Sequence, residues 1–229
     1  IVYTYGGPHV QQVRRSWAGG TPQIFAQSGY VYFILDNRGS WNRGHAFETP
    51  LYRAMGQVEV RDQLAGLDHL RSLDFVDEDR IGIWGWSYGG YMVLASLVHY
   101  DDRLAGGVDI VGISNFVTFL ENTSGYRRDL RRAEYGDERD EDMNAFLQEI
   151  SPSNRAGEIT SPLFIIQGAN DPRVPASEAE QILAAVREAG GEPWYLLALD
   201  EGHGFAKKSN RDFMNAAVTL FLRDTLALD

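Results

Sequence analysis

The chain has 229 residues, enough for one folded unit with a full hydrophobic core, and it carries 21 lysines and arginines against 32 aspartates and glutamates. The resulting net charge of −11 would be repelled by nucleic acids and anionic membranes, so we expect neither as a partner. The absence of cysteine excludes disulfides, thiolate nucleophiles and cysteine-ligated zinc, and no apolar run approaches the ~20 residues that span a bilayer.

Short apolar runs alternate along the chain with segments of helical periodicity. The runs predict strands at residues 1–5, 30–35, 80–86, 106–111, 163–167 and 194–199. The periodic segments predict helices at 58–73, 88–99, 177–189 and 210–226, the third opening on a Ser177–Glu180 capping box. Several strands are apolar on both faces, which is typical of parallel strands covered by helices on each side. The sequence therefore predicts an α/β fold with a mostly parallel sheet and helices on both faces.

Two stretches interrupt this alternation. Residues 37–56 predict a long polar loop, and residues about 112–155 predict a helical, cap-like insertion. The insertion carries Arg127, Arg128, Arg131 and Arg132, followed by a run of acidic residues. These charges indicate either a solvated cap with its own ion pairs or an arginine patch that holds a substrate carboxylate. We find no internal repeat or linker, and so we predict a single domain over residues 1–229.

A candidate nucleophile stands in the pentapeptide Gly85-Trp86-Ser87-Tyr88-Gly89, which follows a predicted strand and precedes an apolar helix. Small glycines on either side allow a sharp turn that holds a serine hydroxyl above the carboxyl edge of the sheet. The turn also places Ser87 at a helix N-terminus, where backbone amides favour developing negative charge. We therefore expect Ser87 to be the nucleophile of an acyl-transfer reaction.

A serine hydroxyl needs a base, and the base needs a carboxylate to orient it. Of the five histidines, His203 lies in a glycine-flanked loop just after the last predicted strand, although His9 and His45 also lie in loops. Asp171 follows the preceding strand on the same edge, whereas we expect Asp200 and Glu201 to be solvated. The order Ser87, Asp171, His203 is that of α/β-hydrolases.

The oxyanion that forms during acyl transfer needs hydrogen-bond donors. The amide of Tyr88, directly after the nucleophile, is one candidate. The turn Tyr5-Gly6-Gly7-Pro8 after the first strand is another, because its glycines permit close approach and the Tyr5 hydroxyl is itself a donor. The alternative for Tyr5 is a core aromatic side chain at the end of a strand.

Five ordered motifs together resemble the prolyl oligopeptidase family of serine peptidases: Tyr5-Gly6-Gly7-Pro8, Asp36-Asn37-Arg38-Gly39-Ser40, Gly85-Trp86-Ser87-Tyr88-Gly89-Gly90-Tyr91, Asn170-Asp171-Pro172-Arg173-Val174 and Gly202-His203-Gly204-Phe205. The resemblance implies an α/β-hydrolase fold with the Ser87, Asp171 and His203 triad and with Tyr5 and Tyr88 at the oxyanion. It further implies that Arg173 holds a substrate carbonyl and that Val174 forms a pocket wall.

The resemblance changes along the chain. Residues 1 to about 91 are similar to the dipeptidyl peptidase IV branch, and the remainder is similar to the acylaminoacyl-peptidase-like branch. One hypothesis is a chimaeric or designed sequence, and the other is an intermediate natural lineage. Where the dipeptidyl branch has a tyrosine pair, this chain has Phe116 and Phe119, which we expect to line an apolar pocket. Family members carry further sheet strands and a β-propeller ahead of this region, and the start at Ile1, inside an apparent strand, leads us to expect chain upstream.

The leading interpretation is a serine hydrolase that cleaves peptide, amide or ester bonds in short peptides or small acyl substrates. An aminopeptidase or oligopeptidase that cleaves after proline or a small apolar residue is one alternative. A non-catalytic binding module of the same fold, or an inactive fragment or designed scaffold, is another. We expect no metal or cofactor, because serine chemistry needs neither. Self-association into a homo-oligomer is a further expectation, because the start at Ile1 leaves a sheet edge exposed.

Overall fold

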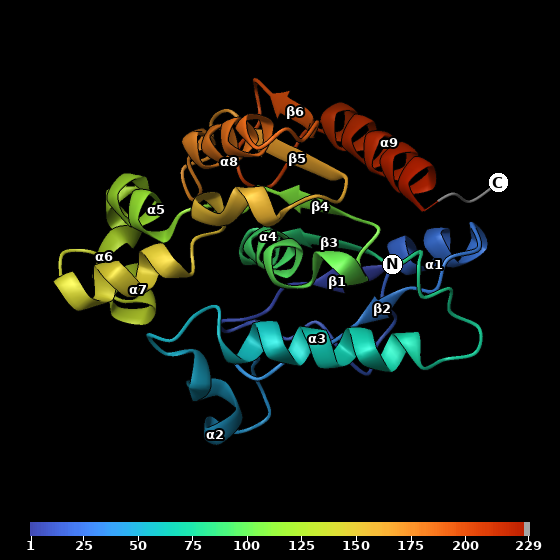
Figure 1. Ribbon diagram of the computed structural model, residues 1–229, viewed down its shortest axis with the longest axis horizontal. Coiled ribbons are helices and arrows are strands. Elements are labelled where there is room, and N and C mark those ends of the chain that lie inside the picture. Colours follow the sequence, from blue (N-terminus) through green and yellow to red (C-terminus); the bar gives the residue numbers. More distant parts are fainter. Residues whose placement is uncertain (227–229) are drawn as a thin grey trace.

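The computed structural model describes residues 1–226, which form a parallel sheet with helices on both faces (Figure 1). The strand order is β2-β1-β3-β4-β5-β6, and every neighbouring pair is parallel. The strands are β1 (Val2–Thr4), β2 (Phe33–Ile34), β3 (Gly82–Trp86), β4 (Gly106–Ile110), β5 (Leu163–Gly168) and β6 (Trp194–Ala198). All six lie within the predicted runs or extend them by one residue, so the α/β fold expected from the sequence is confirmed.

The helices form two layers because the strands present apolar side chains to both faces. Helices α1 (Gly20–Gln27) and α9 (Lys208–Thr225) pack on one face, where Phe25 and Phe221 contact strand residues such as Ile110 and Phe164. Three helices cover the other face through a cluster that includes Leu67, Leu94 and Ile182: α3 (Val58–Arg71), α4 (Tyr88–Tyr100) and α8 (Ala176–Glu188). Strands β4 and β5 are consequently buried along their whole length.

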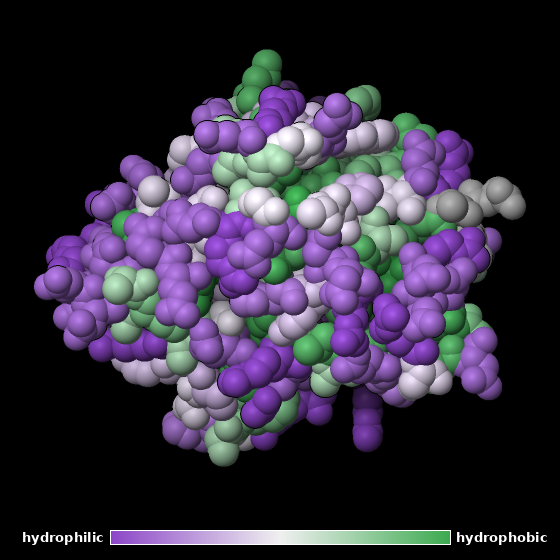
Figure 2. Space-filling view, in the orientation of Figure 1, coloured by the Kyte–Doolittle hydropathy of each residue, from purple (hydrophilic) through white to green (hydrophobic). Residues whose placement is uncertain are grey.

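The predicted insertion between β4 and β5 is helical. It consists of α5 (Phe116–Asn122), α6 (Gly125–Tyr135), α7 (Glu141–Glu149) and the 3₁₀ segment η3 (Pro152–Glu158). Helices α5, α6 and α7 gather at one end of the molecule, on the left in Figure 1. The surface over this end is largely hydrophilic in Figure 2, in keeping with the many arginines and carboxylates of this segment.

Several local predictions were wrong. The stretch 37–56 is not loop throughout, because it contains α2 (His45–Glu48) and the 3₁₀ turn η1 (Thr49–Leu51). Helix α1 was not expected, and the short 3₁₀ turn η2 (Asp101–Arg103) follows α4. The capping box does not form, because α8 begins at Ala176 with Pro175 as its N-cap and Ser177 therefore lies inside the helix. Within residues 1–226, no helix has the length and apolar character of a membrane-spanning segment.

Candidate active site

Ser87 lies in a sharp turn between β3 and α4. Its φ of 62° and ψ of −116° place a non-glycine residue in a sparsely populated region, which costs of order 1–3 kcal/mol and is typical of functional turns. The flanking glycines make the turn sterically feasible. A Cβ at Gly85 would come within 2.2 Å of the Gly89 carbonyl oxygen, and one at Gly89 within 2.3 Å of the Thr4 carbonyl oxygen. The expected strand–turn–helix setting of the serine is therefore present.

The backbone hydrogen bonds around Ser87 leave the Tyr88 amide available as a hydrogen-bond donor. The Ser87 amide donates to the Ile110 carbonyl at 2.8 Å, and the Gly90 amide donates to the Ser87 carbonyl at 2.9 Å. Tyr88 is the first residue of α4, a position whose amide has no partner within the helix. Because Thr4 pairs with Gly85 in the sheet, the next residue, Tyr5, lies beside the same turn and lines the same cavity as Ser87.

The Tyr88 side chain is held from behind by Glu59 of α3. The Tyr88 hydroxyl donates to Glu59 Oε1 at 2.7 Å, and the amides of Gly56 and Gln57 also donate to this carboxylate. Burial raises the pKa of Glu59, and the hydrogen bonds oppose the shift. The sequence showed Glu59 only as an acidic residue in the first turn of a helix. The hydrogen bond to Glu59 holds Tyr88 in place, and the Tyr88 amide is the one that we expect to bind the oxyanion.

His203 and Asp171 are in direct contact. His203 Nδ1 lies 2.6 Å from Asp171 Oδ2, and the other oxygen, Oδ1, accepts the amides of Arg173 at 2.8 Å and Val174 at 3.1 Å. The Asp171 side chain is fully buried, and that of His203 is 12% exposed. A carboxylate that already accepts two amides acts as an acceptor for the Nδ1 proton, which leaves Nε2 free to take a proton from a nucleophile.

The loop after β6 is anchored next to the serine. Trp86 Nε1, one residue before Ser87, donates to the His203 carbonyl at 3.1 Å. The prediction that Glu201 is solvated was wrong: it is buried and accepts the amides of Ala206 at 2.7 Å and Lys207 at 2.9 Å. Asp200, by contrast, is exposed and pairs with Lys207. The three candidate triad residues thus follow β3, β5 and β6 on one edge of the sheet, and Trp86 joins the first and third.

A small cavity of about 70 Å³ lies beside Ser87. Its walls are formed by Tyr5, Pro8, Ser87, Tyr88, Ile113, Phe119, Arg127, Arg131, Tyr135, Arg173 and Val174. Of the four predicted pocket residues, Phe119, Arg173 and Val174 are among them. Phe116 is fully buried and packs edge-on against the Tyr135 ring at 5.7 Å, so it supports the wall from behind. No signal in the sequence singled out Tyr135.

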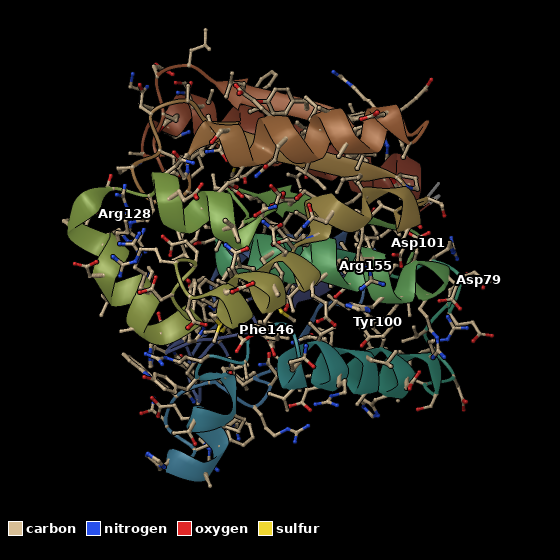
Figure 3. The ribbon with its side chains drawn as sticks, turned by 60° about the vertical axis from the view of Figure 1, so that its left-hand side comes forward. Asp79, Tyr100, Asp101, Arg128, Phe146 and Arg155 are labelled. Atoms are coloured by element: carbon tan, nitrogen blue, oxygen red, sulfur yellow. The ribbon has the colours of Figure 1, made fainter. Side chains whose placement is uncertain are left out.

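Three other histidines have different surroundings. His9 lies beside the Glu134 and Glu48 carboxylates, and Trp41 Nε1 donates to its Nδ1 at 2.8 Å. His45 begins the short helix α2. His99 contacts Arg155, which Figure 3 shows near Tyr100 and well away from Arg128 of α6. Within residues 1–226, no histidine lines the cavity beside Ser87, and His203 differs from the others in its hydrogen bond to Asp171.

Comparison with known proteins identifies relatives along the whole chain. The sequence model of the prolyl oligopeptidase family matches residues 16–229. Dipeptidyl aminopeptidase BIII of Pseudoxanthomonas mexicana is 35% identical over 230 aligned positions, which cover 99% of this chain and 33% of that protein. Dipeptidyl peptidase family member 6 of Caenorhabditis elegans is 33% identical over 99% of this chain and 31% of its own length.

Solved structures agree with the fold. A puromycin-hydrolysing peptidase of Mycobacterium tuberculosis superposes with a TM-score of 0.89 at 27% identity, over 98% of this chain and 34% of that one. The chain thus spans about a third of the length of the relatives it matches. The hypothesis of a chimaera gains no support, because a single relative matches across the supposed junction near residue 92 at 35% identity.

Proposed function

Since the chain belongs to the prolyl oligopeptidase family, we propose that it is a serine peptidase that cleaves peptide, amide or ester bonds through an acyl-enzyme. The observation that carries this proposal is the hydrogen bond between His203 and the fully buried Asp171, on a loop tied to the turn of Ser87. A strained serine turn that Trp86 ties to the loop of an oriented imidazole favours catalysis over a non-catalytic binding module.

The chemistry follows from these positions. The Ser87 hydroxyl attacks the substrate carbonyl while His203 Nε2 accepts its proton, and Asp171 stabilises the imidazolium that forms. The Tyr5 hydroxyl and the Tyr88 amide donate to the oxyanion of the tetrahedral intermediate. His203 then delivers the proton to the leaving amine or alcohol. Water, activated by the same imidazole, attacks the acyl-enzyme, and the acid is released as Ser87 recovers its proton.

We propose short peptides and small acyl compounds as the substrates. The cavity beside Ser87 encloses only about 70 Å³, and helices α5 and α6 contribute Phe119 and Tyr135 to its walls. In this proposal the α5–η3 segment acts as a cap of a single catalytic domain. The names of the relatives, a dipeptidyl aminopeptidase and a puromycin-hydrolysing peptidase, are consistent with small substrates.

The proposed partners follow from charge and from the sheet edges. A net charge of −11 disfavours the binding of nucleic acids, so we propose that the chain does not bind them.

Strands β2 and β6 are the outer strands of the described sheet, and we propose that the chain self-associates through one of these edges. Light scattering of the purified chain at several concentrations tests this: a constant monomer mass would refute self-association.

The catalytic proposal is tested with short-chain p-nitrophenyl esters and with aminoacyl and Xaa-Pro p-nitroanilides. We expect turnover that Ser87→Ala abolishes and that Ser96→Ala leaves intact, since Ser96 is buried on the same helix but does not line the cavity. The ratio of amide to ester turnover separates a peptidase from an esterase. Wild-type turnover by Ser87→Ala would refute the assignment of the nucleophile.

A further inference from the structure

The cavity beside Ser87 is lined by three arginines in an otherwise acidic chain. Arg127, Arg131 and Arg173 all line it, and no aspartate or glutamate among residues 1–226 does. The chain as a whole has 11 more carboxylates than lysines and arginines. Three guanidinium groups around one small cavity therefore have the opposite sign to the net charge of the chain, and we ask which ligand they would bind.

Helix α6 separates its four arginines into two stripes. Residues four apart share a helix face, so Arg127 and Arg131 form one stripe and Arg128 and Arg132 the next. The second stripe makes its contacts within the cap: Arg132 Nε donates to Glu138 at 3.0 Å, and Arg128 Nη2 donates to the Thr123 carbonyl at 3.0 Å, although the Arg128 Nε is buried without a hydrogen-bond partner. Figure 3 shows Arg128 projecting from α6 at this end of the molecule. The first stripe faces the cavity.

The charges of the cavity-facing stripe are incompletely neutralised. Arg131 pairs with Glu134, and its guanidinium lies 5.4 Å from the Tyr135 ring centre, while its Nε is buried without a hydrogen-bond partner. Within residues 1–226, neither Arg127 nor Arg173 forms an ion pair. Burial, followed by the neighbouring charges of Arg131 and Arg173, lowers the pKa of Arg127. An anion in the cavity would relieve this repulsion.

We propose that Arg127 and Arg131, with the added charge of Arg173, bind a carboxylate of the substrate next to the scissile bond. The inference rests on the proposed peptidase function and names its substrate class: peptides with an acidic group at this position. A planar guanidinium can grip a carboxylate through two parallel hydrogen bonds. Ile113, Phe119 and Val174 provide apolar walls for the methylene groups that lead to it.

The volume agrees with this ligand. A cavity that holds one water molecule has a volume of roughly 10–15 Å³ accessible to a water-sized sphere. The cavity beside Ser87, at about 70 Å³, therefore holds a carboxylate with one or two methylene groups. The carboxylate has two sources in a peptide. It is either the side chain of the residue whose carbonyl is attacked or the C-terminal carboxylate of a short leaving peptide, and the experiment separates them.

The experiment compares isosteric substrates that differ in charge. The first arm uses N-acetyl-Glu and N-acetyl-Gln aminomethylcoumarin amides, and the second uses N-acetyl tripeptides with a free or an amidated C-terminus. We expect kcat/KM to be at least about tenfold higher for the charged member of one pair, since hydrogen bonds to charged groups are the strong ones. Arg127→Gln should reduce that ratio about tenfold, whereas Arg211→Gln, an equal charge change at an exposed residue of α9, should preserve it.

Binding is measured separately on the Ser87→Ala chain by calorimetry with the α-amides of N-acetylglutamate and N-acetylglutamine, which differ only in the side-chain charge, and with the two tripeptide forms. Preferential binding of a carboxylate that Arg127→Gln removes supports the inference even without turnover. If neutral substrates are cleaved and neither charged member is preferred, the inference fails while the proposed function stands. A charge preference that persists in Arg127→Gln would also overturn it. If no substrate is cleaved, the proposed function fails, and calorimetry alone decides the carboxylate site.

Discussion

Asp109 places an ionisable group in the middle of the sheet, directly behind the turn of Ser87. It lies in β4, is fully buried, and its Oδ1 has no hydrogen-bond partner. A Cβ on either Gly90 or Gly112 would come within 2.2 Å of this oxygen, so the carboxyl group is tightly enclosed. Burial raises the pKa of Asp109 from 3.8 to about 7; a hydrogen bond from the Gly112 backbone opposes this shift, and the charge of Glu178 adds to it.

This shift makes the stability of the native state depend on pH. Between about pH 4 and 7 the unfolded chain loses the Asp109 proton while the native chain keeps it, so the free energy of unfolding falls as the pH rises. A shift of about three pKa units corresponds to ~4 kcal/mol, at 1.36 kcal/mol per unit. The penalty is absent below the unfolded pKa and complete above the folded one.

Asp109→Asn removes the ionisation at nearly constant shape. We expect the variant to gain stability relative to wild type as the pH rises from 4.5 to 8, by up to ~4 kcal/mol in urea unfolding at each pH. Asp74→Asn, at an exposed residue, is the matched control and should show no such gain. If the Asp109→Asn and wild-type stabilities run parallel across this range, the carboxyl group is not buried in the way described.

Three further variants test the site. Asp171→Asn should lower kcat by roughly three to four orders of magnitude, because the amide no longer stabilises the His203 imidazolium; a loss below tenfold would contradict this role. Tyr5→Phe should lower kcat on p-nitrophenyl esters about 100-fold with little change in KM, and an unaltered kcat would remove its hydroxyl from the oxyanion site. Gly89→Ala should cost at least 1–3 kcal/mol in urea unfolding, because the new methyl meets the Thr4 carbonyl at 2.3 Å; an unchanged midpoint would contradict that contact.

Much of the fold could be predicted because its signals are local. Six apolar runs became six strands, and parallel strands necessarily bring the residues after β3, β5 and β6 to one edge. The neighbouring positions of Asp171 and His203 follow from that rule alone, without knowledge of any contact. Helix α1 escaped prediction because it begins Gly-Thr-Pro and buries only Phe25, so it has no apolar stripe to detect.

The parts that could not be predicted depend on contacts between distant segments. Phe116 and Phe119 are equivalent in the sequence, and both rings contact Tyr135, but only Phe119 lines the cavity, which depends on how α5 packs in the fold. Glu201 resembles a solvated loop residue until the amides that it accepts are seen. Which stripe of α6 faces the cavity likewise depends on how the cap sits over the site, which four arginines in sequence do not reveal.

The central claim is that Ser87 is activated by His203, and labelling with a fluorophosphonate probe tests it most directly. Such a probe forms a stable adduct only with an activated serine, and mass spectrometry of the peptides locates the adduct. We expect one adduct per chain, on Ser87, with the labelling rate reduced at least 100-fold in His203→Ala and unchanged in His99→Ala. An unlabelled Ser87 in the folded chain, or labelling that proceeds equally fast without His203, would contradict the account.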